Sequence, residues 1–190
     1  MPSRHPAAGP SAAQAERILD ARTALLAAPQ RGAPAPLATA QVLACTCGGD
    51  TYALSLDAIA EILPARACVA VPGATAPVIG VSGLAGRLWS VVDLAAALGL
   101  GEAPAAGGLT GHLLRLRHLP RRLLLRVEHV AGVVAASPVA DRPHRGMGAA
   151  AVTGYALAPA GSLAESAVLL GLLDPGLLLG PLLDSSQTGA

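Results

Sequence analysis

The segment PVIGVSGLAGRLWSVVDLAAAL, residues 77–98, contains two short apolar runs separated by glycines. Runs of this length that are rich in β-branched and aromatic residues and end at Gly or Pro are typical of strands. We therefore predict strands over Pro77–Val81 and Arg87–Val92. The carboxylate of Asp93 suits the free N–H groups of a first helical turn, so a short helix is predicted over Asp93–Leu98.

Short runs of the same kind recur on both sides of this segment. Two further helices, Asp57–Leu63 and Asp174–Leu183, are also predicted to begin at Asp. About ten short strands at such spacing favour an all-β barrel or sandwich over a helix bundle. The chain is therefore predicted to be mainly β with short connecting helices. The remaining predicted strands are Val42–Cys47, Thr51–Leu56, Ala67–Val71, His112–Leu116, Arg122–Val127, Val130–Ala136, Ala151–Leu157 and Ala167–Leu173.

The flanks of this β region differ in composition. Residues 1–40 hold 13 Ala, 6 Pro and 2 Gly and are predicted to be a mobile tail. A capping-box spacing and apolar residues at helical intervals predict one short helix near residues 11–28, which either packs on its own domain or docks on a partner. The folded domain is predicted over 41–184, with 185–190 a flexible C-terminus. A break near 101–110 is expected to separate two small barrels, and Ser137–Ala149 is a second break.

The charge balance excludes several classes of function. Twelve acidic residues face thirteen basic ones, for a net charge of +1, so the chain lacks the positive field that nucleic acid or an anionic membrane surface requires. Aromatic residues make up only 2%, which excludes a base-stacking platform. No apolar run reaches the roughly 18 residues of a spanning helix, and three cysteines cannot all pair. We expect a cytoplasmic protein with no membrane insertion.

The sequence contains no complete catalytic or metal-binding motif. Cys45 and Cys47 would share one face of a strand and could converge on a metal, but no second pair completes the site, and buried free Cys is the favoured reading. Cys68 stands alone. No nucleophile elbow, histidine pair motif or dinucleotide-binding glycine loop is present. We therefore expect no enzymatic activity, no cofactor and no metal; a small metal- or ligand-binding barrel using Cys45, Cys47 and a histidine stays open as an alternative.

A basic cluster lies between residues 115 and 126. Its arginines are interpreted as the solvated face and turn of a β-hairpin, with Arg115 and Arg117 on one side. The alternative is a surface for an acidic partner.

An ordered set of short motifs resembles the CheW-like domain of bacterial chemosensory systems. The resemblance covers about residues 41–184. It rests on the order and spacing of Tyr52–Leu56, Ile59–Leu63, Val71-Pro72, Gly80-Val81, Leu84-x-Gly86, Val91–Leu94 and Leu98–Leu100, followed by Val127–Val130, Thr153-Gly154 and Leu172–Asp174.

This resemblance implies two small five-stranded SH3-like β-barrels that share a core. It also implies a non-catalytic adaptor that couples the regulatory domain of a CheA-type histidine kinase to the cytoplasmic tips of methyl-accepting chemoreceptors, in chemotaxis or twitching motility. The residues that it places near partner surfaces are Glu61, Ile62, Val71, Val81, Leu84 and Arg87.

Three residues, Gly83, Ala85 and Glu128, depart from the family pattern. Where the family commonly has Asn-Leu-Arg-Gly, this chain has Gly83-Leu84-Ala85-Gly86, so an arginine of the interaction surface is replaced by Ala85. Glu128 stands where the family has an aspartate. The departures at Gly83 and Ala85 motivate a second hypothesis, a divergent member that binds the kinase but not receptors.

Overall fold

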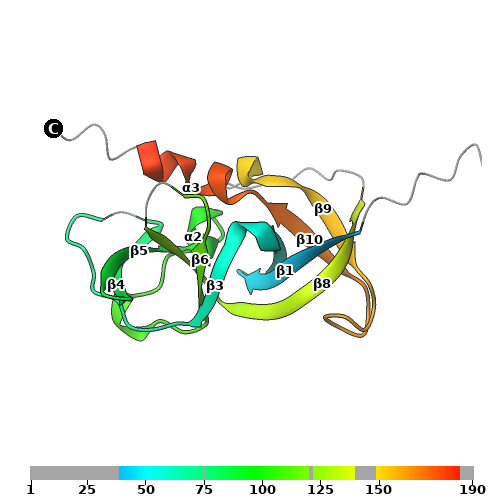
Figure 1. Ribbon diagram of the computed structural model, residues 1–190, viewed down its shortest axis with the longest axis horizontal. Coiled ribbons are helices and arrows are strands. Elements are labelled where there is room, and N and C mark those ends of the chain that lie inside the picture. The colour runs from blue at the N-terminus through cyan, green and yellow to red at the C-terminus, as the bar shows by residue number, and fades with distance from the viewer. Residues whose placement is uncertain (1–38, 75, 120–121, 140–148, 185–190) are drawn as a thin grey trace, which may run out of the picture. The chain divides into compact units, whose positions relative to one another are not determined.

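The computed structural model describes residues 39–74, 76–119, 122–139 and 149–184. The predicted helix near 11–28, the C-terminal residues 185–190 and most of the second break lie outside these ranges. Within them the chain forms ten strands, which belong to two five-stranded sheets (Figure 1). The mainly β fold with two five-stranded units is therefore confirmed.

The first sheet is a closed barrel with the strand order β1-β2-β10-β9-β8. Gly48 and Gly49 join β1 to β2 with φ of 59° and 84°, the primed turn whose twist matches that of the flanking strands. The C-terminal strand β10 pairs parallel to β2 and antiparallel to β9, which completes the closure. Its strands are β1 (Ala40–Cys47), β2 (Asp50–Ser55), β8 (His129–Val139), β9 (Val152–Ala158) and β10 (Val168–Leu173).

The second sheet is open and has the order β3-β6-β7-β5-β4. Its edge strands, β3 and β4, do not pair with each other, and β4 is covered only by a single bridge from Val69 to Val81. The central strand β7 is buried at every position, so both of its faces are covered. The strands are β3 (Ile59–Pro64), β4 (Val78–Leu84), β5 (Arg87–Asp93), β6 (His112–Leu116) and β7 (Leu123–Val127).

The chain passes from the barrel to the open sheet and back. It leaves the barrel after β2, builds all five strands of the open sheet, and returns at β8. The segment 101–110 joins β5 to β6, so it does not separate the two sheets, contrary to expectation. The glycine-rich composition of this segment marks a loop within one sheet, which includes the short 3₁₀ turn η2 (Ala106–Gly108).

Three apolar clusters form the core, and one of them joins the two sheets. Small residues fill the closed barrel, among them Ala44, Ala53 and Ala156. A second cluster, which includes Val91 and Leu124, packs on one face of the open sheet. The largest cluster lies between the sheets and draws on both of them and on two helices, so neither sheet can be removed without exposing the other. Its fully buried members include Leu43, Leu54, Val92, Leu94, Leu98, Leu114, Leu125 and Leu179.

The helices are short. Helix α2 (Leu94–Ala97) begins where expected, and the Asp93 carboxylate accepts a hydrogen bond from the Ala96 N–H at 2.9 Å. Helix α3 (Pro175–Asp184) follows Asp174, whose carboxylate likewise accepts from two first-turn N–H groups. A 3₁₀ turn, η3 (Ala149–Ala151), precedes β9. Among the described residues no helix is both long and apolar enough to cross a membrane.

Two sequence predictions of local structure are wrong. Residues 57–63 do not form a helix: a 3₁₀ turn, η1 (Leu56–Ala58), is followed directly by β3. Pairing with β6 across the sheet decides this short apolar run, whose periodicity alone does not distinguish strand from helix. Residues 67–71 form no strand, and only Val69 is bridged.

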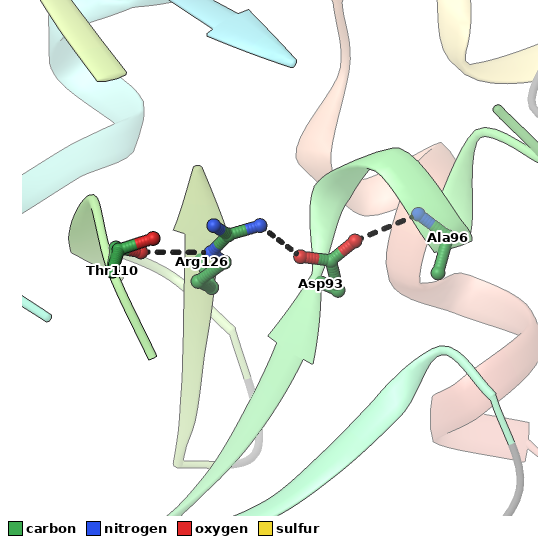
Figure 2. Close-up of polar contacts among 4 residues, drawn as sticks. All are labelled: Asp93, Ala96, Thr110 and Arg126. Atoms are coloured by element: carbon green, nitrogen blue, oxygen red, sulfur yellow. Dashed lines mark hydrogen bonds and ion pairs between the residues drawn. The ribbon is translucent and has the colours of Figure 1, made fainter. Parts of the chain in front are cut away.

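A buried ion pair joins β5 to β7 (Figure 2). The Arg126 guanidinium donates to the Asp93 carboxylate at 2.9 Å and, through Nε, to the Thr110 carbonyl at 3.0 Å. Only 7% of Arg126 and 1% of Asp93 are exposed. Arg126 is therefore a buried structural residue, not part of the solvated basic face that the sequence predicts. The same carboxylate that caps α2 neutralises this arginine, so the pair ties the helix start, a central strand and the 101–110 loop together.

Candidate functional site

The side chains with partner-binding potential gather at one open end of the second sheet. A hollow of about 470 Å³ is lined by Glu61, Leu84, Ala85, Arg87, Trp89 and Arg115. Three of the six predicted site residues, Glu61, Leu84 and Arg87, thus line one hollow although they come from different strands. The opening lies between edge strand β3, its neighbour β6 and the β4–β5 hairpin, so it exists because the sheet is not closed.

An exposed ion pair forms one wall of this hollow. The Nε of Arg115 donates to a Glu61 carboxylate oxygen at 2.9 Å, across the register that pairs β3 with β6. Their side chains are 35% and 44% exposed, so water screens the pair, and it contributes about 0–1 kcal/mol to stability. With Arg87 exposed on the opposite wall, the hollow carries two positive charges and one negative charge. It therefore suits an acidic or hydrogen-bond-accepting group of a partner.

The β4–β5 turn sets the position of the opposite wall. Ala85 and Gly86 adopt φ of 49° and 69°, a two-residue primed turn that brings Leu84 directly opposite Arg87. Ala85 is one of two non-glycine residues with positive φ among those described. Its methyl group presents no charge to a partner, whereas Arg87, one residue beyond the turn, lines the same hollow.

Trp89 also lines the hollow, and the sequence analysis did not identify it. Its indole nitrogen is buried, and in the part of the chain that the structure describes nothing accepts a hydrogen bond from it. A buried donor without an acceptor costs about 1–3 kcal/mol of folding stability. The alternation of Arg87, Trp89 and Val91 toward one face of β5 is the signal that could have identified this residue.

The other three predicted residues do not line the hollow. Val81 lies on edge strand β4, where its backbone exchanges two hydrogen bonds of 2.8 Å with Val69. Ile62 and Val71 are each 41% exposed, Ile62 next to Glu61 on β3 and Val71 in the loop that precedes β4. The structure thus places these three on neighbouring surfaces instead of in one site.

Sequence reasoning missed two exposed apolar residues beside Val81. Val69 is 71% exposed and Leu88 is 69% exposed. The β4–β5 register pairs Leu88 with Gly83, and Gly83 follows Val81 by two residues, so Leu88, Val81 and Val69 share one face. This apolar face adjoins the edge of β4, which only the Val69 bridge covers, and the two together suit another β domain.

A second hollow, of about 440 Å³, lies between the two sheets. Its wall includes Ser55 and Thr153 from the closed barrel, Arg117 and His118 from the chain after β6, and Asp174 at the start of α3. Arg117 is fixed there because its Nε donates to the Ile59 carbonyl at 2.8 Å. We call this hollow the inter-sheet groove.

The cysteines are structural residues. Cys45, Cys47 and Cys68 are all buried. Burial raises the pKa of Cys45 to about 12 and also raises that of Cys47, so both thiols stay protonated at neutral pH and are poor ligands. Across the described ranges, no three His, Cys, Asp or Glu side chains lie close enough to hold a metal ion. The metal-binding alternative therefore receives no support from these residues.

Comparison with known proteins identifies relatives of this architecture. The family model of the CheW-like domain matches residues 41–179. The structure is similar to that of the scaffolding protein TtCheW from Thermoanaerobacter tengcongensis, with a TM-score of 0.55 and 16% sequence identity over 80% of this chain and 92% of that one. The sequence has no match among curated proteins.

Proposed function

The chain belongs to the CheW-like domain family, and on that premise we propose that it is a non-catalytic adaptor of a bacterial chemosensory pathway. It links a CheA-type histidine kinase to the cytoplasmic tips of methyl-accepting chemoreceptors, with chemotaxis or twitching motility as the output. The observation that carries this proposal is the family match, which spans both sheets and nearly all of the described chain.

The open sheet supplies the kinase contact in this proposal. A CheA-type kinase carries a regulatory domain of similar fold, so the contact joins one β domain to another. The uncovered edge of β4 offers backbone groups for this purpose, and Val69 and Leu88 offer apolar area. Arg87 and the Glu61–Arg115 pair line the hollow at the open end of the same sheet, and in this proposal their charges orient the partner.

The inter-sheet groove supplies the receptor contact. It is separate from the open end of the second sheet, so both partners can bind at once. Holding the kinase and the receptor on one small protein raises the effective concentration of each at the other. The adaptor thus acts through geometry and needs no chemical step.

A calorimetric titration tests the kinase contact. The regulatory domain of a CheA-type kinase from the same organism is titrated into this protein, which we expect to bind one to one. Arg87→Glu reverses a charge at the hollow and is expected to weaken binding about tenfold or more, whereas Arg122→Glu, the same change at an exposed residue outside the hollow, leaves it unchanged. Absence of binding by the folded wild-type protein would refute the proposal.

A second candidate, an adaptor that binds the kinase but not receptors, is favoured by the turn of the β4–β5 hairpin. Gly83 and Ala85 present no charged or amide side chain there. Gly83→Asn together with Ala85→Arg would then create receptor binding that the wild type lacks. Receptor binding by the wild type excludes this candidate.

A further inference from the structure

A third hollow lies on the outer face of the closed barrel, away from the surfaces assigned above. It has a volume of about 230 Å³ and is lined by Asp50, Thr51, Tyr52, Tyr155, Leu169 and Gly171. Small-molecule sites usually measure roughly 300–1,000 Å³, so this hollow fits a single side chain better than a whole cofactor.

Strand register explains why the two tyrosines of this chain meet here. Gly171 on β10 pairs with Tyr52 on β2 and with Tyr155 on β9, so the three residues lie side by side on one face. A Cβ at Gly171 would lie 2.9 Å from the Tyr52 ring, which shows that this ring lies against the glycine backbone. The Tyr52 ring therefore covers Gly171, and Tyr155 is the partly exposed aromatic side chain of this face.

Asp50 adds a negative charge at the rim. It lies two residues before Tyr52 on β2 and points to the same face, but unlike that buried tyrosine it is exposed. Burial, with smaller contributions from Cys47, Asp50 and Tyr155, raises the pKa of Tyr52 to about 12. The tyrosine thus stays neutral, and the carboxylate alone supplies the charge of the hollow.

The described residues of the barrel add no basic side chain near this hollow. Residues 39–58, 128–139 and 149–182, which build the described part of the barrel and its loops, contain no Lys or Arg. They contain the acidic residues Asp50, Asp57, Glu128, Glu165 and Asp174. Among the residues that line the hollow, the one charged side chain is thus the carboxylate of Asp50, which attracts a cation.

We propose that the hollow formed by Asp50, Tyr52, Tyr155 and Gly171 is a docking site for an arginine side chain of a partner protein. A planar guanidinium stacks on an aromatic ring and donates two hydrogen bonds to a carboxylate, which are the two chemistries that this hollow presents together. A lysine ammonium pairs with the carboxylate but has no planar group to stack on the ring. The site lies outside the kinase and receptor surfaces and does not depend on the adaptor role.

Nuclear magnetic resonance titration of the whole protein tests this assignment. The probe is arginine blocked at both ends, N-acetyl-arginine-methylamide, and the matched neutral control is the corresponding citrulline compound. We expect the amide signals of Gly171 and Tyr155 to shift with arginine, less with blocked lysine and not with citrulline. Equal shifts with citrulline, tighter binding of lysine, or no shift with arginine would overturn the proposal.

Variants place the binding at the proposed residues. Asp50→Asn keeps the size of the side chain at an exposed position, and Tyr155→Leu removes the partly exposed ring. Each is expected to weaken arginine binding about threefold to tenfold. Glu165→Gln, a change of the same charge in the β9–β10 loop, should have no such effect. Unchanged binding by Asp50→Asn, with a wild-type circular dichroism spectrum, would contradict the proposal.

Discussion

Replacing Arg126 by methionine tests the role of the buried ion pair. The substitution keeps most of the apolar stem but removes the guanidinium that lies 2.9 Å from the Asp93 carboxylate. The Asp93 carboxylate, which is 1% exposed, then keeps its hydrogen bond from the Ala96 N–H but loses its counter-ion. Removing one member of a buried pair costs about 3–5 kcal/mol, which is a large part of the stability of an ordinary domain.

A double-mutant cycle separates the loss of the pair from the loss of packing. Asn is as good a helix-capping residue as Asp, so Asp93→Asn keeps the cap of α2 and removes the charge. The double variant Arg126→Met with Asp93→Asn should then be more stable than the sum of the single losses predicts, by about 2 kcal/mol. The assay is urea unfolding, followed by circular dichroism and by the fluorescence of Trp89, the single tryptophan.

The chain offers a matched control for this measurement. Arg115→Met breaks an ion pair of the same length, 2.9 Å, whose members are 35% and 44% exposed. It should cost no more than about 1 kcal/mol because water screens that pair. Equal losses from Arg126→Met and Arg115→Met, or strict additivity in the cycle, would refute the reasoning that burial makes the Asp93–Arg126 pair important.

Three further predictions concern glycine, turn and thiol positions. Gly80→Ala places a Cβ against the Val69 carbonyl and should cost about 1–3 kcal/mol of unfolding free energy, whereas Gly83→Ala, where a Cβ meets nothing within 4 Å, should not destabilise the protein; equal losses in urea unfolding would contradict this. Ala85→Asn should stabilise the protein by about 0.5–1 kcal/mol, because Asn tolerates the φ of 49° better than Ala does; a lower melting temperature would count against it. The folded pKa of Cys45 is raised from about 9 to about 12, so the stability that its burial provides is complete below pH 9 and is lost as pH rises toward 12. Unfolding measured between pH 8 and 11 should show this decline, and Cys45→Ala should reduce its slope.

The sequence predicted the fold class because the Gly and Pro residues between short apolar runs, and the aspartates before helices, act on local structure. In the structure, Gly48 and Gly49 form the β1–β2 turn with positive φ, and Asp93 caps α2, as these residue types favour. The run 57–63 was misread because its structure is decided by pairing with β6, more than fifty residues away in sequence. Local periodicity carries no information about such a partner.

The candidate site shows the same limit. The family resemblance gave six residues, of which only Glu61, Leu84 and Arg87 line one hollow. Trp89 was missed, and Arg115 was identified only as part of the basic cluster, because both reach the hollow through strand register. Arg126 was misassigned for a similar reason: its counter-ion lies 33 residues away, and nothing in the basic cluster distinguishes a buried arginine from a solvated one.

The central claim is that this chain joins a kinase to receptors, and cosedimentation tests it most directly. A CheA-type kinase is centrifuged with membranes that contain chemoreceptors of the same organism, with and without this protein. The adaptor account predicts that the kinase sediments with the membranes only when the protein is present, and that Arg87→Glu abolishes this effect while Arg122→Glu does not. Kinase that stays in the supernatant with folded wild-type protein present would contradict the account.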